Sequence, residues 1–249
     1  SKTEGYRLID ASTAHRVDEN WTFGLPEMRL EQRAEIAHAN HVSNPGCYAC
    51  AFILLTRPLV RAGVIDRHSA LAIHALSGYS GGGRQLIERW ENAGGGLVGL
   101  PFEAPYAYER VHKHIPEMTK YSGLSSAPQF LPSVGPFYCG MRVQVPVHVD
   151  MLNSGWTPRQ IHELFQSTYD DEAFVHVTPF EETPALSECT LDPRVCNDTN
   201  RLNIHVLANA AGHVTFVAIL DNLGKGACGM AIQSLNIMLG VEENLGLST

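Results

Sequence analysis

The stretch SNPGCYAC (residues 43–50) runs directly into the apolar segment AFILL (51–55). A tight Pro-Gly turn before an apolar run predicts a loop that delivers Cys47 to the first turn of a buried helix. Unpaired N–H groups at a helix start favour negative charge, and the thiolate is the reactive form of cysteine. The stretch therefore predicts a nucleophilic Cys47 that ionises easily, although an inert buried cysteine has the same local sequence.

The spacing of Cys47 and Cys50 allows a second interpretation. A C-x-x-C pair at a helix start is typical of dithiol redox proteins. The chain has no second such pair to complete four ligands, so we expect no metal site. Six cysteines, most of them far apart, are few for 249 residues, so we expect no disulfide framework.

The composition excludes several classes of protein. Hydrophobic residues make up 44% of the chain and charged residues 18%, as in ordinary globular proteins. A formal net charge of −8 argues against a nucleic-acid partner. No apolar run is long enough to cross a bilayer, and the first residues lack the apolar core of a secretion signal. We therefore expect a cytoplasmic protein that binds neither membranes nor nucleic acids.

Hydrophobic periodicity and turn residues predict the elements. Valines alternate with polar residues over 141–149, which predicts a half-buried strand, and TPRQ (157–160) has the form of a capping box. Short antiparallel strands with intervening helices indicate an α+β domain. We expect strands at 6–11, 69–76, 141–149, 202–208 and 213–220, an irregular stretch at 94–108, and helices at 30–39, from 47 to about 58 or 63, 85–92, 116–120, 157–168 and about 227–239.

Other motifs carry possible chemistry. In HKHIPE (112–117), two imidazoles flank a cation beside a carboxylate, so this segment could place a general base near a thiol, or it could be a solvated loop. The glycines of SGYSGGGR (77–84) and DNLGKG (221–226) would let backbone N–H groups approach an anion, although plain connecting turns look the same. Arg16 and Arg142 are further anion-binding candidates, or surface charges.

Together these motifs resemble the N-acetyl-gamma-glutamyl-phosphate reductase family in its shorter, type 2 form. The matching segments occur in the family's order: IDASTAHR (9–16), GLPE (24–27), NPGCY (44–48), SGYSGGGR (77–84), HKHIPE (112–117) and DNLGKGA (221–227). The resemblance implies a fold like that of aspartate-semialdehyde dehydrogenase. The fold class would be α/β plus α+β, with the C-terminal part of a Rossmann NADP-binding domain (1–46), an α+β catalytic and dimerisation domain with a mostly antiparallel sheet (47–221), and a helix returning to the nucleotide-binding domain (222–249).

The resemblance also implies the activity, which is NADPH-dependent reduction of N-acetylglutamyl 5-phosphate to the semialdehyde with release of phosphate, in arginine biosynthesis. Cys47 would form a thioester and His114 would be the acid/base. The enzyme would be a homodimer or homotetramer with NADP(H) as cofactor. The expected binding residues are Ser12, Arg16, His112, Glu117 and Arg142 for the substrate and its phosphate, and Ser77, Gly78, Ser80, Gly81, Asn222 and Lys225 for the cofactor.

The chain departs from the family pattern in two ways. It has no glycine-rich dinucleotide loop, because it begins near what would be a late Rossmann strand. We expect a fragment of a longer protein; a loop supplied by another polypeptide, or a non-catalytic relative, would be alternatives. Ala49 and Cys50 stand where the family often has proline and threonine, and Cys50 adds a thiol that could form an inactive disulfide with Cys47.

Overall fold

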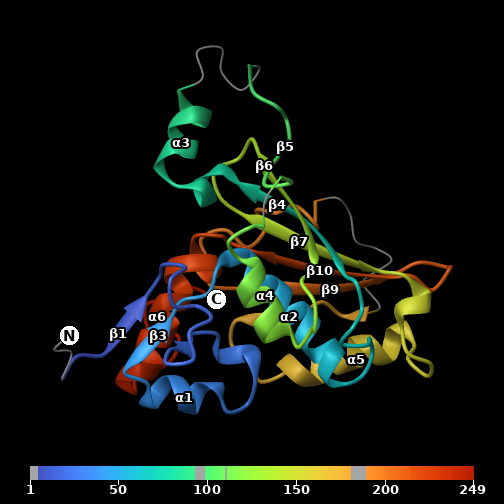
Figure 1. Cartoon of the computed structure of the whole chain (residues 1–249), viewed down its shortest axis with the longest axis horizontal. Coiled ribbons are helices and arrows are strands. Elements are labelled where there is room, and N and C mark those ends of the chain that lie inside the picture. Colours follow the sequence, from blue (N-terminus) through green and yellow to red (C-terminus); the bar gives the residue numbers. More distant parts are fainter. Residues whose placement is uncertain (1–4, 93–98, 110, 181–188) are drawn as a thin grey trace.

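A computed structural model describes residues 5–92, 99–109, 111–180 and 189–249 of the chain. A twisted seven-stranded sheet crosses the molecule, with strand order β5-β6-β4-β7-β10-β9-β8, and a second sheet of order β1-β3-β2 lies beside it (Figure 1). In the large sheet the β4–β6 and β8–β9 pairs are parallel and the other four pairs are antiparallel. This confirms the expected mixed fold with a mostly antiparallel sheet.

The strands of the large sheet differ in length and in how well the sequence predicted them. Its strands are β4 (Ala72–Gly78), β5 (Ala104–Pro105), β6 (Gln129–Gly135), β7 (Met141–Val147), β8 (Val175–Val177), β9 (Leu202–Ala208) and β10 (Val214–Leu220). β7 was predicted from its alternating pattern. The β9–β10 hairpin was predicted from two β-rich runs joined by a short turn containing Gly212. β6 and β8 were missed, because Pro132 interrupts the first and the second has only three residues.

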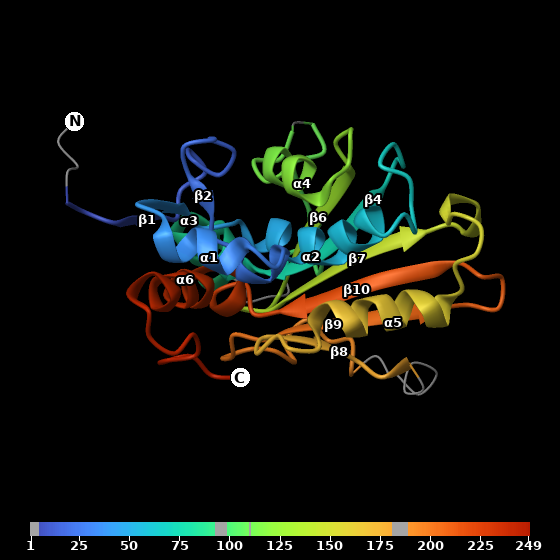
Figure 2. The same cartoon turned by 90° about the horizontal axis from the view of Figure 1, so that it is seen from below.

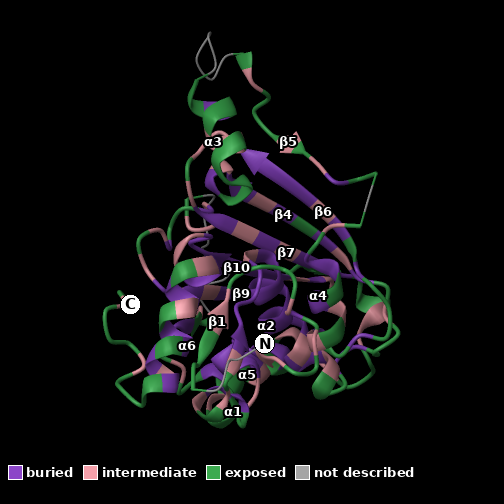
Figure 3. Cartoon of the chain, turned by 60° about the vertical axis from the view of Figure 1, so that its left-hand side comes forward, coloured by how far each residue is buried: buried purple, intermediate pink, exposed green. Residues whose placement is uncertain are grey.

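Helices cover one face of the large sheet (Figure 2). They are α2 (Cys47–Arg61), α4 (Ile115–Ser122) and α5 (Pro158–Tyr169). α2 packs on β7 and β10, and its side chains from Cys50 to Leu55 are almost completely buried (Figure 3). The helix continues through Pro58 to Arg61, inside the predicted range of end points. The predicted capping box at Thr157 and Gln160 starts α5.

The small sheet is parallel and consists of β1 (Leu8–Asp10), β2 (Thr22–Phe23) and β3 (His41–Ser43). α1 (Gln32–His38) and the C-terminal α6 (Gly229–Leu239) pack together beside it (Figure 1). Ile36, Val42 and Met238 form a separate small core there. The last helix of the chain therefore lies against the N-terminal parallel layer.

Two further segments shape the region around the ends of the strands. A 3₁₀ turn (Tyr79–Gly82) and α3 (Arg84–Glu91) follow β4, and a π-helical turn (Gly224–Cys228) precedes α6. Residues 94–98 of the stretch expected to be irregular lie outside the described residues, and β5 falls in the rest of it. No helix in the described part of the chain is long and apolar enough to cross a bilayer.

Candidate active site

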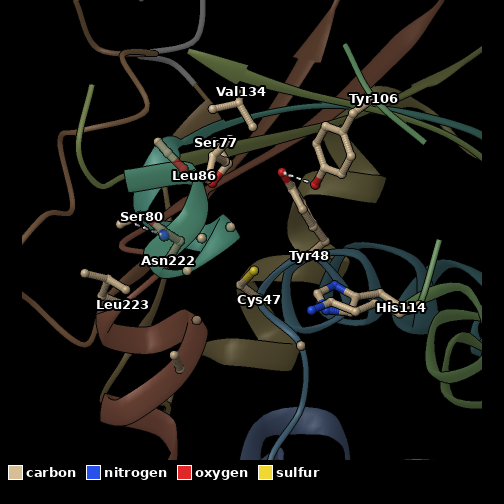
Figure 4. A pocket seen from close by; sticks show the side chains of 18 of the residues that line it. Cys47, Tyr48, Ser77, Ser80, Leu86, Tyr106, His114, Val134, Asn222 and Leu223 are labelled. Carbon is tan, nitrogen blue, oxygen red and sulfur yellow. Dashed lines mark hydrogen bonds between the residues drawn. The ribbon is translucent and has the colours of Figure 1, made fainter. Parts of the chain in front are cut away.

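A cavity of about 1440 Å³ opens where β4 ends, between the start of α2 and the π-helical turn. Segments from almost the whole length of the chain meet there, and Cys47 lies between Asn222 and His114 (Figure 4). The structure thus brings most of the sequence motifs together. The predicted site residues that line this cavity are Arg16, Cys47, Ser77, Gly78, Ser80, Gly81, His112, His114 and Asn222.

Cys47 is the first residue of α2, as predicted. Its Cβ lies 2.7 Å from where a side chain on Gly226 would begin, so only glycine permits this close approach. Burial raises the pKa of the Cys47 thiol to about 11, although the Tyr48 backbone N–H and Arg16 both act to lower it. The prediction that the thiol ionises easily is therefore wrong for this structure, because loss of solvation outweighs the helix start. The thiol needs a base.

His114 supplies a candidate for that base. It immediately precedes α4, and its ring packs over Gly46, where any Cβ would overlap the imidazole. Burial, and the positive charge of nearby groups, hold the pKa of His114 well below its usual value. Among the described residues its buried Nδ1 has no hydrogen-bond partner. The ring is therefore neutral near pH 7 and can accept a proton.

Glu117 lies behind the cavity wall and is buried. One carboxylate oxygen accepts a hydrogen bond from Arg16 Nη1 at 2.8 Å and the other from the Gly46 N–H at 3.1 Å. Arg16 also donates to the carbonyl oxygens of Asn44 (2.9 Å) and Ala11 (3.2 Å). Burial raises the pKa of Glu117 to about 7 against the attraction of Arg16. The hydrogen bonds of Glu117 thus hold the turn before Cys47, and none of them orients an imidazole.

Aromatic side chains enclose His112 on the same side of the cavity. Its ring contacts Tyr48, Phe130 and Tyr106, with the Phe130 ring centroid at 5.0 Å. The His112 Nδ1 accepts a hydrogen bond from the His114 backbone N–H at 3.2 Å. The hydroxyls of Tyr48 and Tyr106 are hydrogen-bonded at 3.2 Å (Figure 4). These tyrosines were not among the predicted site residues. Tyr48 directly follows the nucleophile in the sequence, whereas Tyr106 has no local sequence signal.

The opposite wall comes from the end of β4 and from Asn222. The Asn222 Nδ2 donates to Ser80 Oγ at 3.0 Å, and its Oδ1 accepts from the Gly140 N–H at 2.7 Å. A Cβ on Gly81 would lie 3.4 Å from both Asn222 Nδ2 and Ser77 Oγ, so a larger side chain there would cover these polar groups. The wall therefore presents polar atoms and bare backbone to the cavity.

Comparison of the sequence with known proteins identifies relatives along nearly the whole chain. The family model described as "Semialdehyde dehydrogenase, dimerisation domain" matches residues 47–222. "N-acetyl-gamma-glutamyl-phosphate reductase 2" of Nostoc sp. is 43% identical over 97% of this chain and 76% of its own length. The reductase of Burkholderia cenocepacia (strain J2315) is 42% identical over 95% of this chain and 75% of its own length.

The chain belongs to the N-acetyl-gamma-glutamyl-phosphate reductase family. It spans about three quarters of the length of these relatives.

Solved structures show the fold of this reductase-family chain. Aspartate semialdehyde dehydrogenase II from Vibrio cholerae superposes with a TM-score of 0.67 at 17% identity, covering 93% of this chain and 72% of that one. The enzyme from Francisella tularensis gives 0.68 at 14% identity, covering 94% and 74%. The expected likeness to the aspartate-semialdehyde dehydrogenase fold is confirmed.

Besides Glu117, three residues expected in the site of this reductase-family chain do not line the cavity. Ser12 is exposed, and its Oγ donates to Asp10 Oδ1 at 2.6 Å. Arg142 alternates with the core residues of β7, so it lies on the sheet face opposite α2, where it donates to the Leu191 carbonyl at 2.8 Å.

Lys225 is the third, and it is completely buried. Its Nζ lies 2.6 Å from Glu27 Oε1 and 2.7 Å from Gln233 Oε1, in a closed polar cluster beneath the π-helical turn. A lysine and two glycines before a helix suggested an anion site from sequence. In the structure the Lys225 ammonium instead pairs with the carboxylate of Glu27, which the fold brings next to it from the N-terminal part of the chain.

Proposed function

We propose that this chain catalyses the reduction of N-acetylglutamyl 5-phosphate to the 5-semialdehyde with release of phosphate, in arginine biosynthesis, with NADPH as reductant. One observation carries the proposal: Cys47 begins α2 inside a large cavity, beside a buried and neutral His114. The names of relatives that match along nearly the whole chain support the substrate. We further propose a cytoplasmic homodimer or homotetramer, in keeping with the matched dimerisation domain.

The residues of the chain perform the acyl transfer. His114 takes the thiol proton, and the Cys47 sulfur attacks the acyl carbon of the substrate. The bond between that carbon and the phosphate oxygen breaks, phosphate leaves, and a thioester joins the acyl group to Cys47. Pre-placed donors beside the reacting oxygen, the N–H groups at the start of α2, stabilise the negative charge that develops on it.

The nicotinamide cofactor, when bound, supplies the hydride that reduces the thioester. The wall formed by Ser77, Gly78, Ser80, Gly81 and Asn222 fits this group, since it is free of large side chains and offers polar atoms to a flat amide-bearing ring. His114, on the other side of Cys47, holds the proton needed at the carbonyl oxygen and takes it back as the carbon–sulfur bond breaks. Cys47 then returns to its starting state.

The geometry gives little support to dithiol exchange. Cys50 is completely buried under the first turn of α2, and burial raises its pKa to about 12. A resolving thiol has to reach its partner and ionise, and this one is poorly placed for both. All six cysteines are free thiols in the structure.

The test follows NADPH oxidation with N-acetylglutamyl 5-phosphate, using purified protein. We expect Cys47→Ser to abolish turnover and Cys50→Ala, the matched control, to retain it. Mass spectrometry of the protein quenched with substrate but without NADPH should show one acyl group on the peptide containing Cys47. Full turnover by Cys47→Ser, or acylation at another residue, would contradict the proposal.

A further inference from the structure

The basic side chains that line the cavity differ in whether other groups of the protein already pair with their charge. Arg16, Arg89 and Lys113 line it. Arg16 is buried, and its guanidinium is tied to Glu117 and to two carbonyl oxygens. Arg89 lies on α3, the helix that follows the 3₁₀ turn after β4. Within the described residues the Lys113 ammonium has no hydrogen bond or ion pair to the protein, and the side chain is exposed.

Lys113 stands between His112 and His114, immediately before α4, and its side chain is exposed at the cavity. Its charge acts on the reacting groups: it helps to lower the pKa of both Cys47 and His114. The neighbouring carboxylate, Glu117, is occupied by Arg16 and the Gly46 N–H. The exposed Lys113 ammonium can therefore meet an anion that enters the cavity beside the thiol.

We propose that Lys113 binds the phosphoryl group of the acyl phosphate, a role that the family resemblance implied for Arg16 and Ser12. This inference rests on the proposed function. The phosphate is attached to the carbon that Cys47 attacks, so it has to lie beside the sulfur, whereas the substrate's own carboxylate lies at the far end of the molecule. Lysine is a compact point charge that pairs readily with phosphate. Its exposure also allows the released phosphate to leave.

The reverse reaction separates the two anions of the substrate. With the semialdehyde, inorganic phosphate and NADP⁺, phosphate and the carboxylate-bearing aldehyde have separate KM values. We expect Lys113→Met to raise the KM for phosphate about tenfold or more, as loss of one charged hydrogen bond does, and to leave the KM for the aldehyde unchanged. Lys113→Arg should recover part of the phosphate affinity.

A matched control is Lys120→Met. Lys120 lies on α4, donates to the Val17 carbonyl at 2.9 Å and does not line the cavity, so both KM values should stay at the wild-type level. A rise in the KM for the aldehyde alone in Lys113→Met would assign Lys113 to the carboxylate and overturn the proposal. Unchanged values for both substrates would overturn it as well.

A second measurement does not depend on turnover, so failure of the proposed function can be told from failure of this inference. Iodoacetamide, which is neutral, alkylates Cys47, and we expect inorganic phosphate to slow this alkylation in the wild type and in Lys120→Met. Lys113→Met should lose that protection. Equal protection in all three proteins, or none in the wild type, would overturn the role of Lys113 even if the reductase activity is present.

Discussion

Glu117 and Arg16 form an ion pair of 2.8 Å immediately behind the turn that carries Cys47. Both side chains are buried, and the second oxygen of Glu117 holds the Gly46 N–H. Arg16 belongs to the N-terminal parallel layer and Glu117 to α4, so the pair fixes these two parts of the molecule relative to the nucleophile. Arg16 lines the cavity and Glu117 lies behind its wall. Together they hold the turn that positions Cys47.

The ionisation of Glu117 makes stability depend on pH. Burial raises the pKa of Glu117 from 4.5 to about 7. Between pH 4.5 and 7, Glu117 therefore keeps its proton in the folded chain but has lost it in the unfolded chain. Stability from this group is full below pH 4.5 and declines as pH rises towards 7. Urea unfolding at several pH values should therefore show Glu117→Gln gaining on the wild type as pH rises through this window. A constant difference between the two proteins would contradict the raised pKa.

Replacing Lys225 tests the buried pair with Glu27. Lys225→Met leaves an unpaired carboxylate in a closed cluster, so we expect the free energy of unfolding to fall by about 3–5 kcal/mol. Lys225→Met combined with Glu27→Leu removes both charges and should recover most of this loss. Isothermal titration calorimetry of the folded variants with NADPH should show the same affinity as the wild type, because Lys225 does not line the cavity. A large loss of NADPH affinity at normal stability would instead return Lys225 to the cofactor site.

Gly46→Ala tests the contact between the α2 turn and the imidazole. The new Cβ would overlap the His114 ring, which has to move away from Cys47. We expect kcat to fall by about 10²-fold, because small displacements of a catalytic base have effects of this size. The control is Gly99→Ala, where a Cβ meets nothing within 4 Å and activity should be normal. Unchanged kcat in Gly46→Ala would show that His114 does not act in that position.

Cys50→Ala separates packing from redox chemistry. The thiol is completely buried, so its loss should lower the free energy of unfolding by about 1 kcal/mol, the value of one buried methylene-sized group. Turnover should remain close to normal. Unfolding experiments measure the stability loss and kinetic assays measure the turnover, with Cys189→Ala, whose thiol is exposed, as the control for both. If activity disappears in Cys50→Ala as completely as in Cys47→Ala, the dithiol interpretation would regain support.

Local structure that depends on short-range chemistry could be predicted from the amino-acid sequence. The turn before Cys47, the capping box at Thr157 and the β9–β10 hairpin each follow from residues a few positions apart, and the structure contains all three. The family followed from several motifs that occur in the family's order along the chain, and their combination was more specific than any one of them. The candidate nucleophile and the histidine pair could therefore be named in advance.

The role of each charged side chain, in contrast, depends on which distant segments the fold brings next to it. Arg16 and Lys225 were anion-binding candidates from sequence, and each meets a carboxylate from a distant segment, Glu117 or Glu27. The acidity of Cys47 was likewise set by burial, which no local pattern records and which outweighed its place at a helix start. In each case the energy of a charge depends on its access to solvent and on partners that are far away in the sequence, and these are set only when the chain folds.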